Sequence, residues 1–173
     1  LNVPHSGTGT DQEISVSPAS RAFGSRDVDV GPSASQAVTI RNVGTAPLSF
    51  TGAGIAITGP DASEFLVTNS PATTPLAPGA SREVLVAFDP TTVGAKTASL
   101  TITSDDTDEA TINVGLTGTG IDQEIDVSPA ALHFGVQDVR AGATAAQTVT
   151  ITNTGTAPLA ISSVSISGAA AAE

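Results

Sequence analysis

The sequence repeats itself at a long spacing. The letters GTGTDQEI at 7–14 return almost unchanged as GTGIDQEI at 118–125, so Asp11 and Asp122 open two copies that start 111 residues apart. This spacing is typical of tandem whole domains, because short-repeat solenoids return every 20 to 50 residues or so. The place of Gly-Thr-Gly before each copy predicts that it forms the joint between consecutive domains.

Aligning the two copies predicts how the chain is divided. LNVPHSGTG at 1–9 matches INVGLTGTG at 112–120, so we expect residues 1–10 to be the last strand of a preceding domain. VTIRNVGTAPL at 38–48 matches VTITNTGTAPL at 149–159. Only the copy that starts at Asp11 is present from its beginning to its last strand at 112–120, so we expect it to form one whole domain.

We place that complete domain at 11–120 and the first half of a following one at 121–173. Half a sandwich leaves its core open, so we expect 121–173 by itself to be disordered or to self-associate through its open strands. Its apolar side chains are expected to face a second sheet that this segment does not encode. They are Ile125, Val127, Phe134, Val149, Ile151 and Ile161.

Short strands with alternating polarity recur through residues 11–120. Val38 and Ile40 alternate with polar neighbours, and Phe23 precedes a glycine, as a core aromatic beside a bend would. Asn42 and Gly44 follow as turn residues, and both tolerate positive φ. About seven such strands, with turn signals every 8–12 residues or so and no helical periodicity, predict an all-β immunoglobulin-like sandwich.

Composition excludes several classes of partner. The formal net charge is −11 and Lys96 is the single lysine, so the chain should repel nucleic acid and acidic membrane surfaces. No cysteine is present, which excludes disulfides and thiolate metal sites. No apolar run approaches the length of about 18 residues that a membrane helix needs, so membrane insertion is not expected.

Two histidines are the first candidates for catalysis. His5 and His133 lie opposite Leu116 and Ala22 in the other copies, so neither histidine is repeated. The sequence supplies no nucleophile elbow, no His-rich metal spacing and no glycine-rich loop that opens a helix. We therefore expect no enzymatic activity and no cofactor.

Acidic residues are the candidates for a metal site. Four of them crowd one turn at 105–109, and others flank the two joints at 11–13 and 122–124. Ca²⁺ takes about six to eight oxygen ligands, but this spacing fits no EF-hand loop, so a solvated hairpin turn is the simpler interpretation and we expect no metal. The calcium candidates are Asp105, Asp106, Asp108, Asp122 and Glu124. Glu109 belongs to the same turn as the first three, and Asp11 and Glu13 flank the first joint as Asp122 and Glu124 flank the second.

The order of motifs resembles a known family. VSP, FG, QxVTIxNxGTAPL, PG, VxFxP and LxGTG follow one another through the chain. This order is similar to that of Hydin-type Ig-like domains, which are related to ASH and major-sperm-protein-like modules and occur in bacterial choice-of-anchor D multi-repeat proteins. The resemblance implies tandem seven-stranded sandwiches with a non-enzymatic scaffold or interaction role.

Two functions are compatible with that resemblance. The first is a structural or adhesive module of a larger bacterial protein that is secreted or exposed at the cell surface. Its partners would be neighbouring repeats, with other proteins or surface glycans bound by parts outside this chain. The alternative is an intracellular scaffold of the ciliary or microtubule-associated type, located in the cytoplasm or cilium, which binds partners through exposed strand edges.

Overall fold

The computed structural model describes residue 4, residues 6–69 and residues 71–168. Contacts between Cα atoms divide the chain into two compact units, Leu1–Ile121 and Asp122–Glu173. Among its described residues, the first unit is built of strands, turns and loops with one short 3-10 helix, η1 (Ala62–Glu64). No helix in the described part of the chain is long and apolar enough to span a membrane.

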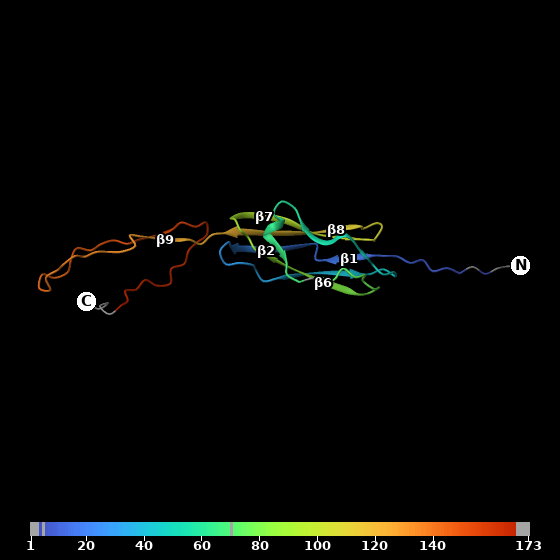
Figure 1. Cartoon of the computed structure of the whole chain (residues 1–173), viewed down its shortest axis with the longest axis horizontal. Helices are drawn as coiled ribbons and strands as arrows, with labels where there is room; N and C mark the ends of the chain where they lie inside the picture. Colours follow the sequence, from blue (N-terminus) through green and yellow to red (C-terminus); the bar gives the residue numbers. More distant parts are fainter. Residues whose placement is uncertain (1–3, 5, 70, 169–173) are drawn as a thin grey trace. The chain divides into compact units, whose positions relative to one another are not determined.

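The first unit consists of two four-stranded sheets packed as two layers (Figure 1). One sheet is antiparallel, in the order β1-β3-β6-β5. The other has the order β2-β8-β7-β4, in which β2 runs parallel to β8 and the remaining pairs are antiparallel. The strands are β1 (Ile14–Ser17), β2 (Ser20–Asp27), β3 (Gln36–Asn42), β4 (Phe50–Thr58), β5 (Phe65–Val67), β6 (Ser81–Phe88), β7 (Gly94–Ser104) and β8 (Thr111–Ile121).

The predicted all-β immunoglobulin-like sandwich is confirmed. Strands β1 and β2 are two halves of one opening strand: Ser17 ends β1 in the first sheet, and after Pro18 the chain enters the second sheet as β2. Counted together, they give the seven strands that the patterning predicts. Because a proline has no backbone N–H to donate, Pro18 is suited to the point where the chain leaves one sheet for the other.

The core lies between the two layers and contains the residues that alternation assigned to it. Val38 and Ile40 are fully buried, and Phe23 packs against Phe65 and Phe88 with ring centroids 5.7 and 6.1 Å apart. Gly24, the bend glycine, has a φ of 71°. The buried cluster comprises Ile14, Val38, Ile40, Leu48, Phe65, Leu76, Val84, Val86, Phe88, Leu100, Ile102, Val114 and Leu116.

In the second unit, residues 122–168 are described and contain one antiparallel pair of strands, β9 (Ile125–Ser128) and β10 (Thr150–Asn153). Its register repeats that of β1 and β3, since Val127 lies opposite Ile151 as Val16 lies opposite Ile40. The burial of the strand residues differs. All the apolar residues that we expected to face a missing sheet are exposed, namely Ile125, Val127, Phe134, Val149, Ile151 and Ile161.

Candidate functional site

A loop after β3 holds the segment that enters the first unit. Thr45 N and Ala46 N both donate to the carbonyl oxygen of Asp11 at 2.8 Å, and Val43 N donates to the carbonyl oxygen of Glu13 at 2.8 Å. In return, Asp11 N donates to Thr45 Oγ1 at 3.0 Å. These bonds involve only backbone atoms of the entry segment, so the loop fixes the backbone of that segment and makes no hydrogen bond to its side chains here. We call this loop, residues 42–47, the clamp.

Close approach explains the glycine in the clamp. A Cβ on Gly44 would lie 2.5 Å from the carbonyl oxygen of Asp11 and 2.6 Å from Glu13 N, distances that real side chains do not reach. Asn42 and Gly44 both tolerate positive φ, but neither residue adopts it here. Glycine is required here because the entry segment crosses the place of a side chain.

Asn42 stabilises the clamp from inside the domain. Its side chain is fully buried, and Nδ2 donates to the carbonyl oxygens of Ala46 at 2.8 Å and Leu76 at 2.7 Å. Gly44 N donates to Asn42 Oδ1 at 3.0 Å. Leu76 also pairs with Leu48, which attaches the Pro- and Thr-rich loop between β5 and β6 to the chain just after the clamp.

The second unit contains the same clamp. Thr156 N and Ala157 N donate to the carbonyl oxygen of Asp122 at 2.8 Å, and Asp122 N donates to Thr156 Oγ1 at 2.9 Å. Thr154 N donates to the carbonyl oxygen of Glu124 at 3.0 Å. A Cβ on Gly155 would collide with the same backbone atoms, those of Asp122 and Glu124. The identical letters DQE and NxGTAP therefore produce identical local structure.

The Gly-Thr-Gly motif does not form the joint that the sequence predicted. Residues 118–120 lie inside β8, where all three pair with β7 and two of them, Thr119 and Gly120, also pair with β2. A Cβ on Gly118 would lie 2.5 Å from the ring of Phe88, and one on Gly120 would collide with the carbonyl oxygen of Thr92. These glycines are present because the core ring and a neighbouring loop occupy the space of their side chains.

The joint is reduced to a single peptide bond. Ile121, the last residue of β8, is paired with Asp27 and accepts a hydrogen bond from Val28 N at 3.0 Å. Asp122, the next residue, is held by the clamp of the second unit. Both sides of the bond between residues 121 and 122 are therefore fixed within their own units.

The acidic candidates near the first clamp are brought together by the fold. Carboxylate oxygens of Glu13, Asp106 and Asp108 all lie within 4.8 Å of one another. Asp106 is buried, and its carboxylate accepts hydrogen bonds from Ile14 N at 2.9 Å and from Asp108 N and Glu109 N at 3.2 Å. Asp106 thus ties the start of β1 to the turn between β7 and β8.

The three carboxylates have different pKa shifts. Burial alone would raise the pKa of Asp106, but hydrogen bonds from the backbone N–H groups of Ile14 and Glu109 outweigh it and lower that pKa. The pKa of Asp108 is raised, first because its carboxyl is hydrogen-bonded to Asp106. The pKa of Glu13 is raised by desolvation and then by the negative charges of Asp106 and Asp108.

The other calcium candidates have different surroundings. Asp105 Oδ1 accepts a hydrogen bond from Ser49 N at 2.7 Å, which attaches the turn to the start of β4. Asp122 and Glu124 belong to the second unit, where their backbone carbonyls are the acceptors of the clamp. The acidic residues that the sequence grouped as possible ligands therefore include several hydrogen-bond acceptors for the protein's own backbone.

The histidines show no catalytic grouping in the described part of the chain. His5 lies outside the described residues. His133 is exposed, and its carbonyl oxygen accepts a hydrogen bond from Gln147 Nε2 at 2.8 Å.

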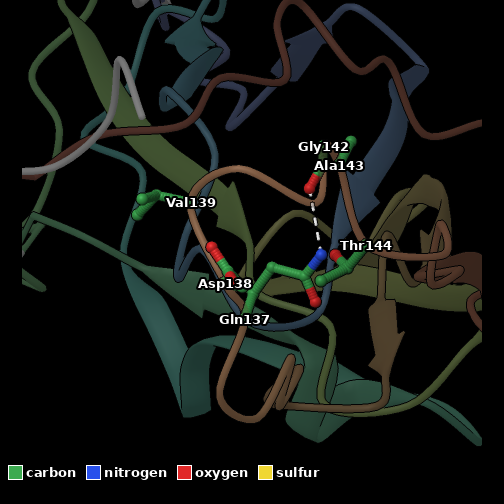
Figure 2. A pocket seen from close by; sticks show the side chains of 6 residues that line it. All are labelled: Gln137, Asp138, Val139, Gly142, Ala143 and Thr144. Atoms are coloured by element: carbon green, nitrogen blue, oxygen red, sulfur yellow. Dashed lines mark hydrogen bonds between the residues drawn. The ribbon is translucent and has the colours of Figure 1, made fainter.

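A shallow pocket in the second unit is formed by one turn of the chain (Figure 2). Gln137 Nε2 donates to the carbonyl oxygen of Gly142 at 3.0 Å, and Asp138, Val139 and Thr144 also line the pocket. The first unit has the same bond at the matching positions, where Arg26 Nε donates to the carbonyl oxygen of Gly31 at 2.8 Å. The side-chain amide of Gln137 is thus used to close the turn.

A buried ion pair was missed by the sequence reasoning. Lys96 and Glu64 are both buried, with Nζ and Oε1 4.0 Å apart. Thr91 N and Thr91 Oγ1 also donate to the Glu64 carboxylate, at 2.5 and 2.8 Å. The alternation of β7 gave the signal, because Lys96 has the same parity as the inward residues Leu100 and Ile102. The pair fixes the loop between β6 and β7.

Several solved structures are similar to part of this chain. Its fold is similar to a protein of unknown function from Porphyromonas gingivalis W83, with 21% identity, 64% of this chain and 46% of that chain covered, and a TM-score of 0.48. The ASH/PapD-like domain 7 of human CEP192 matches with 18% identity, coverage of 72% and 95%, and a TM-score of 0.46. The secreted serine protease VesC of Vibrio cholerae matches with 20% identity, coverage of 67% and 24%, and a TM-score of 0.44.

The chain spans less than half the length of the Porphyromonas protein and about a quarter of VesC. No curated protein matches it. A family model, the HYDIN/CFA65/VesB-like Ig-like domain, matches residues 12–119, which is more than half of the chain. The chain therefore belongs to the HYDIN/CFA65/VesB-like Ig-like domain family.

Proposed function

We propose that this chain is a non-enzymatic structural module of a repeat array, in a larger bacterial protein that is secreted or exposed at the cell surface. The observation that carries the proposal is the absence of slack at the joint. Ile121 is paired within the first unit and Asp122 is clamped within the second. If the connection between the units is to lengthen beyond the bond between residues 121 and 122, hydrogen bonds of Ile121 or Asp122 must break.

This joint differs physically from an ordinary linker. Flexible Gly/Ser linkers allow an end-to-end distance of about 5–6 Å times the square root of their length, and so let domains move independently. Here the clamp fixes the first three residues of a repeat and β8 fixes the last residues of the repeat before it. An array joined in this way has no slack in the connection between one repeat and the next.

The use of the polar residues supports a non-enzymatic role. Asp105 and Asp106 accept hydrogen bonds from backbone N–H groups, and Glu64 is paired with Lys96. Groups used in this way hold turns and loops in place. The partners we propose are neighbouring repeats, with other proteins or surface glycans bound by other parts of the parent protein.

The strand edges favour an array over the alternative of a ciliary or cytoplasmic scaffold. Docking by strand addition needs a long regular edge. In the first unit, the edge strands β1 and β5 have four and three residues, and the edge strands β4 and β2 are interrupted by register shifts. Such edges offer few consecutive backbone groups to a partner peptide.

Small-angle scattering on three consecutive copies of residues 11–121 tests the proposal. We expect an elongated, stiff particle, because each β8 alone is about 35 Å long at roughly 3.3 Å per residue. The matched control has ten Gly/Ser residues inserted between Ile121 and the next Asp11, and should give a broad distribution of shapes. A compact globule, or identical curves for the two arrays, would contradict the proposal.

A further inference from the structure

The outer face of the β2-β8-β7-β4 sheet carries small, uncharged side chains. Residues of these strands alternate between the core and the opposite side, as Leu100 and Ile102 alternate with Thr101. None of the residues on the opposite side is buried. We call this surface the threonine face. It consists of Ser20, Ala22, Ser25, Thr51, Ala56, Thr58, Ala95, Thr97, Ser99, Thr101, Thr103, Thr111, Asn113, Gly115, Thr117 and Thr119.

The threonine face contains no charged residue, although the formal net charge of the chain is −11. The acidic residues of the turn at 105–109 lie beyond one end of the face, and Asp27 and Asp61 lie near the other end. The outer face of the other sheet differs, because it carries Arg41 and Glu83. The threonine face is therefore an uncharged area with acidic residues at both ends.

Polar groups on the threonine face bond to one another across three strands. Thr58 Oγ1 and Thr101 Oγ1 are 2.8 Å apart, and Thr101 Oγ1 donates to Asn113 Oδ1 at 2.9 Å. Because these groups have partners within the face, a surface that covers them leaves fewer polar groups without a hydrogen bond. Each threonine also carries a methyl group, so covering the face removes apolar area from water.

The size of the threonine face is sufficient for a specific protein interface. Strands β7 and β8 have 11 residues each, and the sheet has four strands. At about 3.3 Å per residue and about 4.8 Å between strands, the face measures about 36 by 19 Å, or roughly 700 Å². Two such faces in contact bury about 1,400 Å², and specific interfaces bury about 1,200–2,000 Å².

Charge and shape together define the partner. A charged surface placed on the threonine face would lose its hydration and meet no opposite charge there. The partner surface must therefore be uncharged, and a second sheet is suitable because sheets pack face to face when their strand directions agree within about 30°. This chain supplies such a sheet itself, whereas contact through its acidic ends would bring like charges together.

We propose that the threonine face is a contact surface for the same face of a second copy of this chain. A two-fold axis passes through the contact, so that both copies use the same residues. In a repeat array, this contact joins two chains side by side. The inference is independent of the proposed array function, because it concerns the contact between two chains and not the joint within one chain.

Sedimentation equilibrium of the 173-residue chain tests the proposal. We expect a dimer at about 100 µM, because interfaces of this size have Kd values of about micromolar or lower. Thr117→Glu should weaken association by about 100-fold or more, because the two-fold axis brings two new charges into one uncharged interface. Thr117→Lys should weaken it as strongly, even though this change makes the net charge of the chain less negative.

The matched control is Ser15→Glu. It adds the same charge at an exposed position on the outer face of the other sheet, so the dimer should persist. Thermal melting followed by circular dichroism shows whether each variant is folded, and Thr117 is itself exposed, so its substitution should leave the fold intact.

Three outcomes would overturn the proposal. The first is a 173-residue chain that stays monomeric at about 100 µM, since an interface of this size should then be occupied. The second is a dimer that persists in both Thr117 variants. The third is a dimer that Ile151→Asp abolishes and Thr117→Glu does not, which would place the contact on the exposed strands of the second unit.

Discussion

Two stretches of this chain with nearly the same sequence have opposite burial. Ile40 is fully buried in the first unit, whereas its counterpart Ile151 is 38% exposed in the second. The strand register and the clamp are the same in both. The difference teaches that local sequence specifies strands, pairing and loops, while burial depends on the strands that pack across the core.

The largest expected effect is a charge placed on the two matching core positions. Ile40→Asp should destabilise the first unit by more than about 4 kcal/mol, because an unpaired carboxylate would enter a fully buried site. Ile151→Asp should leave the unfolding of the first unit unchanged. Urea unfolding of residues 1–173 with each variant gives both values, and equal effects would refute the contrast in burial.

The clamps offer a second comparison, in which the two units should behave alike. Gly44→Ala should cost the first unit about 3 kcal/mol, since the new Cβ would lie 2.5 Å from the Asp11 carbonyl oxygen and push the entry segment away. Gly155→Ala should speed amide exchange at Thr156 and Ala157. Gly31→Ala, at a turn glycine with no close neighbour, separates crowding from the strain of positive φ. A tolerated Gly44→Ala would contradict the clamp.

Removal of Asp106 tests whether the acidic turn is structural. Asp106→Ala should destabilise the first unit by about 2 kcal/mol, because it leaves the backbone N–H groups of Ile14 and Glu109 without their acceptor. Amide exchange at Ile14 should increase most. The second unit provides the internal reference, and its exchange at Thr154 should not change. A neutral substitution would show that the turn does not fix β1.

The stability of the first unit should depend on pH, because the pKa values of Glu13, Asp106 and Asp108 are shifted in opposite directions. A raised pKa in the folded state makes Glu13 and Asp108 favour folding at low pH, and this contribution is lost as pH rises through their folded pKa values. Asp106 has a lowered pKa, so its contribution is present above its ordinary pKa of 3.8 and is lost as pH falls through the folded value. Glu13→Gln should therefore raise Tm at pH 7 and have a smaller effect at pH 4. A larger gain at pH 4 would reverse the sign.

Calcium should have the smallest effect. The three carboxylates within 4.8 Å could attract a cation, but Asp106 already has backbone donors. Melting of residues 1–121 with excess calcium and with chelator should agree within a few degrees, because a ligand adds about 2.7 kcal/mol only at a hundred times its Kd. A rise of about ten degrees that Asp108→Asn abolishes would establish a metal site at the cluster.

The sequence predicted which segments of the candidate site are important, but it did not predict which of them are in contact. The copies of DQE and NxGTAP marked both segments as important, but residues 11–13 and 42–47 are separated in sequence and their contact depends on the fold. The sequence also singled out the acidic residues at 13 and at 105–109, but as two separate segments. Pairing and turn positions bring Glu13 to Asp106, and no local pattern reports that distance.

The sequence by itself determined the strands, because alternation with a period of two places Val38, Ile40, Leu100 and Ile102 on inward faces wherever the strands lie. It also determined that two copies share one design. Only the tertiary structure decided why Gly44, Gly118 and Gly120 are glycines, since each is crowded by atoms from a distant part of the chain. It likewise decided which copy is buried. Burial depends on the other strands that pack against a face, and the residues of one strand do not determine whether those other strands are present.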